Sequence, residues 1–232
     1  MPFDAAVVAA YHAVSGISAV LVPVIGGSGT AIAIIAFTAL VRICLHPLNR
    51  AQVRAEKART VLAPHVLGLK TKHKGDPARL NRETMELYKK NGISPFAGLL
   101  PVFVQIPVFT VVYRIFVSSA IGGHHNALLT RNLFGTALGS HLGTGPLTIG
   151  HVAVFAALLA AVLAIATWSS FRMRSAVAAQ PNGTGRLLRL LPYGSVLTAA
   201  VVPLAAGLYL ATTTLWTVVE RRHLTRDRPL TA

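Results

Sequence analysis

Residues 31–48 form an apolar run long enough to cross a lipid bilayer, and one arginine, Arg42, stands inside it. A hydrocarbon core about 30 Å thick takes roughly 20 helical residues to cross. A charged side chain at its centre costs about 2.5–3.5 kcal/mol on insertion scales, so such a residue usually faces protein or water. The run therefore predicts a membrane-spanning helix whose single charge has a role beyond packing.

The composition of the whole chain also indicates a membrane protein. Of its 232 residues, 53% are hydrophobic and only 12% are charged, whereas soluble domains average about 25% charged residues. The net charge of +15 would suit a nucleic-acid-binding protein. The basic residues lie between the apolar runs, however, where they set topology and meet anionic lipids. We therefore expect no sequence-specific recognition of nucleic acid.

Four apolar stretches are long enough to span the bilayer, at about 28–48, 96–117, 149–169 and 187–219. The last has 33 residues, and basic residues flank it on both sides. Because positively charged loops stay in the cytoplasm, both its ends lie inside, and it crosses twice with a turn near Pro203 to Gly207. The predicted fold class is all-α: a polytopic membrane protein with five transmembrane helices, its N-terminus outside and its C-terminus in the cytoplasm.

The apolar N-terminal segment 5–22 has no flanking basic residues. We expect an amphipathic helix at the outer membrane surface, with a further transmembrane helix as the alternative. The predicted organisation is then an outer helix and lead-in over 1–27, a five-span core over 28–222 and a basic cytoplasmic tail over 223–232.

The polar segment 49–95 is predicted to form a cytoplasmic helical hairpin. Asp76-Pro77 is typical of an N-cap followed by proline at the first helical position, and Asn91-Gly92 ends the helix. A second helical stretch of the hairpin is expected upstream, over 50–63, with a turn between Lys70 and Gly75. The hairpin residues that we take as candidates for contact with its partners are Arg50, Arg54, Lys57, Arg59, Lys70, Lys72, Lys74, Asp76, Tyr88, Lys89 and Lys90.

Two blocks of sequence carry a family resemblance. The first is Val-Arg-Ile-Cys-Leu-His-Pro-Leu at 41–48, where the arginine stands five residues before Pro-Leu. The second comprises Gly-Asp-Pro at 75–77 and the run 86–109, which includes Tyr-Lys-Lys-Asn-Gly-Ile-Ser-Pro-Phe. Together these blocks resemble the YidC-type membrane protein insertase family, over about 28–222 and most strongly over 41–115. Leu210 to Trp216 departs from the family pattern, because the usual Tyr-Trp pair is missing.

The resemblance implies a short five-span insertase of the bacterial plasma membrane, which is not an enzyme and needs no cofactor or metal. In that family the spans enclose a water-filled groove, open to the cytoplasm and to lipid, into which the arginine projects. The implied partners are newly made membrane proteins and anionic lipids. The ribosome, the signal-recognition machinery and a Sec-type channel are further candidates.

Arg42 and Gln105 are the residues that we expect to line such a groove. No acidic residue lies in a predicted span to neutralise Arg42, so its partners should be water or neutral acceptors. Additional lining candidates are Ser195, Thr212, Thr213 and Thr214, and candidates for the path of a client helix are Phe103, Ile106, Phe109 and Trp216. Ordinary readings stay open: a snorkelling arginine, interhelical hydrogen bonds and lipid-facing packing.

Two other functional classes are weaker. Gly26-Gly27-Ser28-Gly29 matches the Gly-x-Ser-Gly of rhomboid proteases, with His151 as a conceivable base, but a nucleophile needs its base within hydrogen-bond reach. His124-His125 is too sparse for a metal site without further ligands, and no His-Glu-x-x-His motif is present. A transporter would show inverted repeats, which the sequence lacks.

Overall fold

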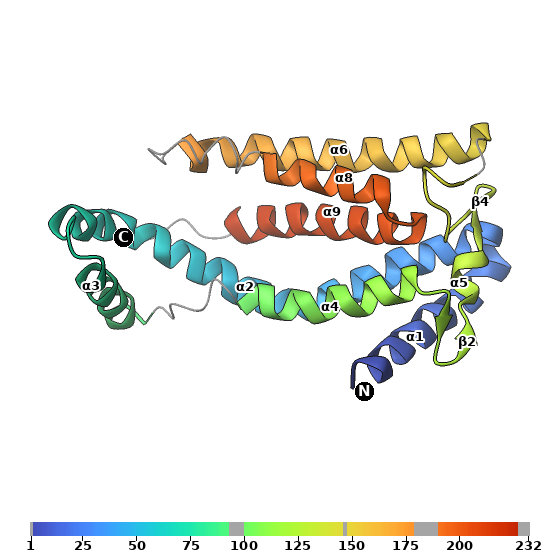
Figure 1. The fold of residues 1–232 in the computed structure, drawn as a ribbon, viewed down its shortest axis with the longest axis horizontal. Coiled ribbons are helices and arrows are strands. Elements are labelled where there is room, and N and C mark those ends of the chain that lie inside the picture. Colours follow the sequence, from blue (N-terminus) through green and yellow to red (C-terminus); the bar gives the residue numbers. More distant parts are fainter. Residues whose placement is uncertain (1, 93–99, 146–147, 179–189, 227–232) are drawn as a thin grey trace. The chain divides into compact units, whose positions relative to one another are not determined.

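The computed structural model describes residues 2–92, 100–145, 148–178 and 190–226, and most of them are helical (Figure 1). The helices are α1 (Pro2–Ile25), α2 (Gly29–Lys72), α3 (Pro77–Lys90), α4 (Leu100–Val117), α5 (Ala127–Thr130), α6 (Ile149–Ala178), α8 (Gly194–Val201) and α9 (Leu204–Arg226), with 3₁₀ turns η1 (Gly26–Ser28) and η2 (Leu191–Tyr193). The predicted all-α class is confirmed for these residues. The chain forms two compact units, 1–43 with 109–220 and 44–108 with 221–232.

Two helical stretches in the described ranges are long and apolar enough to cross a membrane, Asp4–Lys72 and Ile149–Phe171. Shorter apolar helices cover Ile106–Val117 and Leu191–Val201. The count of five spans and the orientation of the termini stay predictions.

In the first unit, α1 turns through η1 into α2. Gly26 takes a positive φ of 72° in this turn, and the hydroxyls of Ser18 and Thr30 share a hydrogen bond of 2.7 Å across it. The helix predicted over 5–22 is therefore present. Its exposed side carries Val20 and Val24, so α1 is apolar on the exposed side too, as suits contact with lipid.

The turn predicted within 187–219 lies between helices α8 and α9. Val202, between them, is extended (φ −78°, ψ 160°), because the residue before a proline is pushed out of the helical region. The break falls at Val202-Pro203, at the start of the predicted turn. α8 packs along α6, and Figure 1 shows α9 running back beside them.

The segment between α4 and α6 contains two small β-hairpins that the sequence analysis did not predict. Strand β1 (Ala120–Ile121) pairs antiparallel with β2 (His124–His125), and β3 (Asn132–Leu133) with β4 (Thr136–Ala137). Each two-residue turn has positive φ at both positions, at Gly122-Gly123 and at Phe134-Gly135. These are the backbone angles that type I′ hairpin turns require.

Buried backbone contacts join this segment to its neighbours. Asn126 is fully buried, and its side-chain amide donates to the carbonyls of Ile115 and Ser118. The N–H of Leu204 donates to Ser140 O at 3.0 Å, and that of Ala205 donates to Leu138 O at 2.9 Å. The first turn of α9 is thereby fixed to the segment that follows β4.

In the second unit, α2 continues without interruption to Lys72, through Pro47 and Pro64. The helical stretch predicted over 50–63 is confirmed as part of this longer helix, and the turn predicted between Lys70 and Gly75 covers 73–76. Each proline removes one backbone N–H and disfavours an interior helix position by about 3 kcal/mol. The alanine- and arginine-rich residues between them are strong helix formers, which favours continuation.

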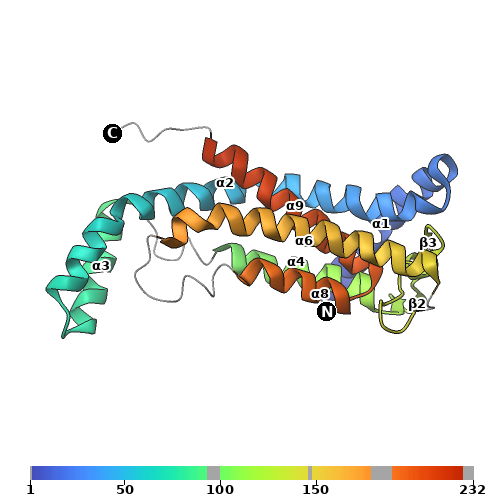
Figure 2. The same cartoon turned by 90° about the horizontal axis from the view of Figure 1, so that it is seen from above.

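The predicted N-cap of α3 is confirmed. The Asp76 carboxylate accepts a hydrogen bond of 2.9 Å from the N–H of Arg79, and Pro77 takes the first position. The helix ends at Lys90, with Asn91 as the C-cap and Gly92 at a φ of +66°. Figure 2 shows α3 folded back beside the end of α2.

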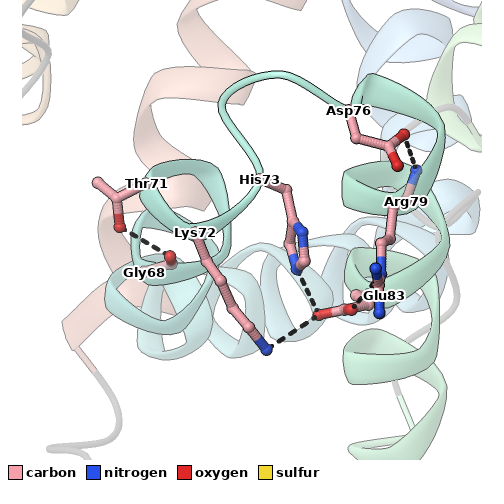
Figure 3. A network of polar contacts seen from close by, with 7 residues as sticks. All are labelled: Gly68, Thr71, Lys72, His73, Asp76, Arg79 and Glu83. Carbon is pink, nitrogen blue, oxygen red and sulfur yellow. Dashed lines mark hydrogen bonds and ion pairs between the residues drawn. The ribbon is translucent and has the colours of Figure 1, made fainter.

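Glu83 joins α3 to the end of α2 (Figure 3). Its carboxylate accepts a hydrogen bond from His73 Nε2 at 2.9 Å and lies 3.5 Å from Arg79 Nε and 3.9 Å from Lys72 Nζ. The His73 hydrogen bond, more than the neighbouring positive charges, holds the pKa of Glu83 below its ordinary value of 4.5. The ionised carboxylate is therefore the form that the hairpin favours.

Two further sets of contacts hold the second unit together. The Arg59 guanidinium lies over the Tyr88 ring, 5.9 Å from its centroid, and joins α2 to α3. The end of α9 meets α2 through Arg221 and Glu56, 3.6 Å apart, and through a 3.0 Å hydrogen bond from Lys57 Nζ to Leu224 O. Several hairpin cations thus also have structural partners.

We predict that acid loosens the hairpin at Glu83. Because the folded-state pKa is depressed, the contribution is present above the ordinary carboxyl range and is lost as pH falls through the folded value. Amide hydrogen exchange of the full chain should show α3 opening more often in Glu83→Gln than in wild type at neutral pH, and equally often at the acid end. The control is Glu86→Gln, whose exposed pair with Arg82 lies within one helix. Equal exchange in both variants at neutral pH would contradict the assignment.

Gly29→Ala should destabilise the turn between α1 and α2. A Cβ at this position would lie 2.8 Å from backbone atoms of Val22, which cannot move aside independently. We expect a loss of about 1–3 kcal/mol, as for other overpacked sites, seen as a lower melting temperature in detergent. Gly16→Ala is the matched control, because nothing lies within 4 Å of its added Cβ. A Gly29→Ala protein as stable as that control would refute the packing argument.

Candidate functional site

Arg42 extends the face of α2 that turns toward α9. Thr38, one turn earlier, is almost fully buried, and Arg42 itself is half-buried. Ile35, two turns earlier, lines an apolar groove together with residues of α9. Because positions seven apart lie almost in line on a helix, Arg42 points to the same side as Ile35.

Helix α9 presents a polar stripe, which we define as Tyr209, Thr213, Trp216 and Glu220. Their spacing of four, three and four residues places them on one helical face. Tyr209, Thr213 and Glu220 are only 7%, 9% and 8% exposed. The Thr213 hydroxyl and the Trp216 indole N–H are buried and have no hydrogen-bond partner within the described part of the chain. Buried polar groups of this kind ordinarily bond to protein or to ordered water.

The polar stripe and Arg42 interact. Tyr209 and Glu220 both lie within electrostatic reach of the Arg42 guanidinium. We expected no acidic residue within a predicted span, and Glu220, one residue beyond the last predicted span, contributes to the electrostatics of Arg42. The last predicted span ends at 219, whereas α9 continues to Arg226 and keeps Glu220 on the helix, buried.

Three of the predicted lining hydroxyls bond to their own helical segments. Thr212 donates to Leu208 O and Thr214 to Leu210 O, each at 2.8 Å, and Ser195 donates to Pro192 O at 2.6 Å. Such bonds are the ordinary use of a hydroxyl in a membrane helix. Thr213 differs from all three, because its hydroxyl makes no such bond with any described residue.

The other predicted site residues lie mainly on α4. Gln105 and Phe103 belong to this helix, but their side chains fall outside the described residues. Ile106 and Phe109 are exposed, and the Phe109 ring stacks on Tyr113 at 5.8 Å between centroids. Trp216 is half-buried in the polar stripe of α9.

An apolar groove of about 650 Å³ lies next to the polar stripe. Its walls come from α2, α6 and α9 and from Leu133 and Phe134 of the second β-hairpin. On α6 the wall combines small residues, Gly150, Ala153, Ala157 and Ala161, with the larger Val154, Leu158 and Ile165. The groove could not be predicted from the sequence, because α6 is apolar on every side and its sequence does not indicate which face lines a groove.

The protease alternative gains no support from the geometry. Ser28 lies in η1, and both ring nitrogens of His151 are buried with no hydrogen-bond partner in the described ranges. The His151 ring packs instead on Phe155, with 4.9 Å between centroids. The nucleophile and base that acyl transfer requires are therefore not brought together.

The relatives found by comparison with known proteins share one name. The chain is 39% identical over 87 residues to a protein of Campylobacter jejuni, 37% over 90 residues to one of Clostridium perfringens and 45% over 84 residues to one of Helicobacter pylori. Each of the three is named membrane protein insertase YidC. The matches cover 38%, 39% and 36% of this chain, and 16%, 38% and 15% of the respective relatives.

A family described as 60Kd inner membrane protein matches residues 21–229, which is most of the chain. This range includes Arg42, the hairpin and the whole of α9. The chain therefore belongs to the 60Kd inner membrane protein family, as its resemblance to YidC-type insertases predicted.

Proposed function

We propose that the chain is a membrane protein insertase, which moves apolar segments and short tails of newly made membrane proteins from the cytoplasm into the bilayer. The observation that carries the proposal is the half-buried Arg42 on α2, whose electrostatic neighbours Tyr209 and Glu220 belong to the polar stripe of α9 inside an otherwise apolar group of helices. A charge there is costly unless hydrated or paired. Two buried polar groups without a partner in the described protein suit a site that receives water.

In this proposal the hydrated site lowers the free-energy barrier to moving a client's polar tail into the membrane. The tail carries charges and backbone groups that lipid cannot satisfy. Arg42 attracts an acidic tail through a field that is stronger beside low-dielectric walls than in bulk water. Gln105 is proposed to share this site. The five spans, with the N-terminus outside and the C-terminus inside, place its open end toward the cytoplasm.

The apolar groove beside the polar stripe is proposed to take the client's hydrophobic helix. It adjoins the polar stripe on α9, so that a client's tail and its apolar segment meet neighbouring surfaces. The small residues of α6 allow a helix to approach closely, as they do between membrane helices in general. Phe103, Ile106, Phe109 and Trp216 remain proposed contacts along the client's path.

The basic hairpin is proposed to meet the delivery machinery at the cytoplasmic surface. Its positive charge attracts phosphate, whether in anionic lipid headgroups, in the RNA of a translating ribosome or in the signal-recognition machinery, without reading a base sequence. Cooperation with a Sec-type channel is part of the same proposal. No cofactor and no catalytic residue enter it.

Arg42→Ala should reduce insertion of a client with an acidic N-terminal tail about tenfold, the effect of roughly 1.4 kcal/mol of lost attraction. The assay is protease protection of that tail in proteoliposomes containing the purified chain. Arg131→Ala is the control, because it removes one arginine from the exposed outer segment. Insertion no better than in empty liposomes would refute the insertase, and equal insertion by both variants would reduce Arg42 to a structural role.

Ala157→Phe should reduce insertion of the same client about fivefold or more, because the added ring takes up room that the client's helix would occupy, and overpacking of this kind costs about 1–3 kcal/mol. Ala157 lines the groove. Ala160→Phe is the matched control on the same helix, since Ala160 is exposed and is not a lining residue. Equal insertion by the two variants would show that clients do not use the groove.

A further inference from the structure

Phe134 occupies the first position of the turn between β3 and β4, and its backbone is left-handed, with a φ of 48°. Gly135, at the second position, has a φ of 81°. Turns of this kind favour Asn-Gly, because a left-handed backbone is unfavourable for most residues that carry a Cβ and is tolerated best by glycine and asparagine. Phenylalanine therefore destabilises this turn relative to asparagine.

Packing within the chain offsets little of this cost. Phe134 is 78% exposed, so little of it is buried against other residues, whereas Leu133 beside it is half-buried. An apolar side chain stabilises a fold in proportion to the area that it buries. Strained residues that persist cluster at functional sites, and Phe134 is therefore a candidate for contact with a ligand.

The Phe134 side chain stands at one end of the apolar groove, which it lines together with Leu133. A Cβ added to Gly150 would lie 3.8 Å from the carbonyl oxygen of Phe134, so the turn lies beside the start of α6. From Gly150 the groove-lining residues of α6 extend to Ile165, fifteen positions or roughly 22 Å along the helix. In the proposed topology, the end of the groove at Phe134 faces the outside.

We propose that Phe134 is a positioning residue, whose ring contacts the leading end of a client's hydrophobic helix and sets how far that helix advances along the groove. The leading end is the one that lies farthest from the cytoplasm. This role rests on the proposed insertase function and adds the residue that fixes the register of the client. The contact with the client offsets the cost of the strained turn.

The chemistry of the side chain favours a helix over the lipid headgroups as the partner. Tryptophan and tyrosine are the residues that anchor proteins at the membrane surface, where one end of the ring is apolar and the other is wet. Phenylalanine has no polar group to place in that layer. Its ring continues the apolar lining of the groove instead, and a client helix in the groove reaches it end-on.

Two variants separate the stability of the turn from the role in insertion. Phe134→Asn gives the turn its preferred Asn-Gly sequence, so the melting temperature in detergent should rise by about 2–4 °C. Insertion of a single-span client, scored by protease protection in proteoliposomes, should nevertheless fall about fivefold, because an apolar contact is lost. Phe134→Leu keeps an apolar side chain on the strained turn, so it should insert the client within about twofold of wild type without the gain in stability.

The contact itself is measured with p-benzoylphenylalanine, a photo-cross-linking analogue of phenylalanine, at position 134. Irradiation during insertion should join it to the leading one or two turns of the client's hydrophobic helix, as mapped by mass spectrometry. The same analogue at Ile165 should join to client residues about fifteen positions farther from the leading end. Leu163 is the matched control, because it is exposed on the same helix and is not a lining residue, and the analogue there should form no adduct with the client.

Three results would overturn the role of Phe134 in a protein that inserts the client. They are equal insertion by wild type and Phe134→Asn, insertion that rises with stability across the three proteins, and adducts at position 134 with lipid alone or with residues spread over the whole client helix. Wild-type protein that inserts no client above empty liposomes overturns the proposed function itself, so the two failures are distinguishable.

Discussion

A guanidinium held among apolar helices needs polar surroundings, and two polar neighbours of Arg42, Tyr209 and Glu220, come from α9. Arg42 lies within reach of Tyr209 and Glu220 only because α9 runs beside α2 in a particular register. That register is fixed at the first turn of α9, where the N–H groups of Leu204 and Ala205 bond to carbonyls of the segment after β4. The segment between α4 and α6 is therefore part of what positions the charge.

Helix α9 has two adjacent faces with different chemistry. The polar stripe meets Arg42, and the neighbouring face, with Leu208 and Leu215, lines the apolar groove. A client that inserts into a bilayer has the same two-part character, a polar tail and an apolar helix. The proposed function follows from this match, since each part of the client meets a surface that stabilises it.

Local chemistry made much of the fold predictable from the sequence. Asp76-Pro77 and Asn91-Gly92 gave the bounds of α3 because caps act over one turn, and loop charge predicted the turn between α8 and α9. The continuation of α2 through Pro47 and Pro64 was missed. Proline signals a break locally, whereas the helix formers on both sides and the contacts with α3 favour continuation.

The site was less predictable, because it depends on how two distant helices pair. Arg42 could be singled out from the sequence, because a charged side chain within the hydrocarbon core is energetically costly. Glu220 could not be singled out in this way, since the apolar run alone does not indicate where α9 ends. Thr212, Thr213 and Thr214 are identical in type and consecutive, and only the helical phase relative to α2 distinguishes Thr213. The spacing of Tyr209, Thr213, Trp216 and Glu220 was the available signal.

The most direct test of the central claim is the accessibility of position 213 from each side of the membrane. In a Cys44→Ser background, Thr213→Cys in oriented vesicles would be offered a membrane-impermeant maleimide from the cytoplasmic or the outer face. Leu215→Cys, on the apolar side of α9, is the control. Labelling of position 213 from the cytoplasmic face alone is the predicted result, because Arg42 and the polar stripe then share water open to that side. Absence of labelling at 213, or labelling only from outside, would contradict the account.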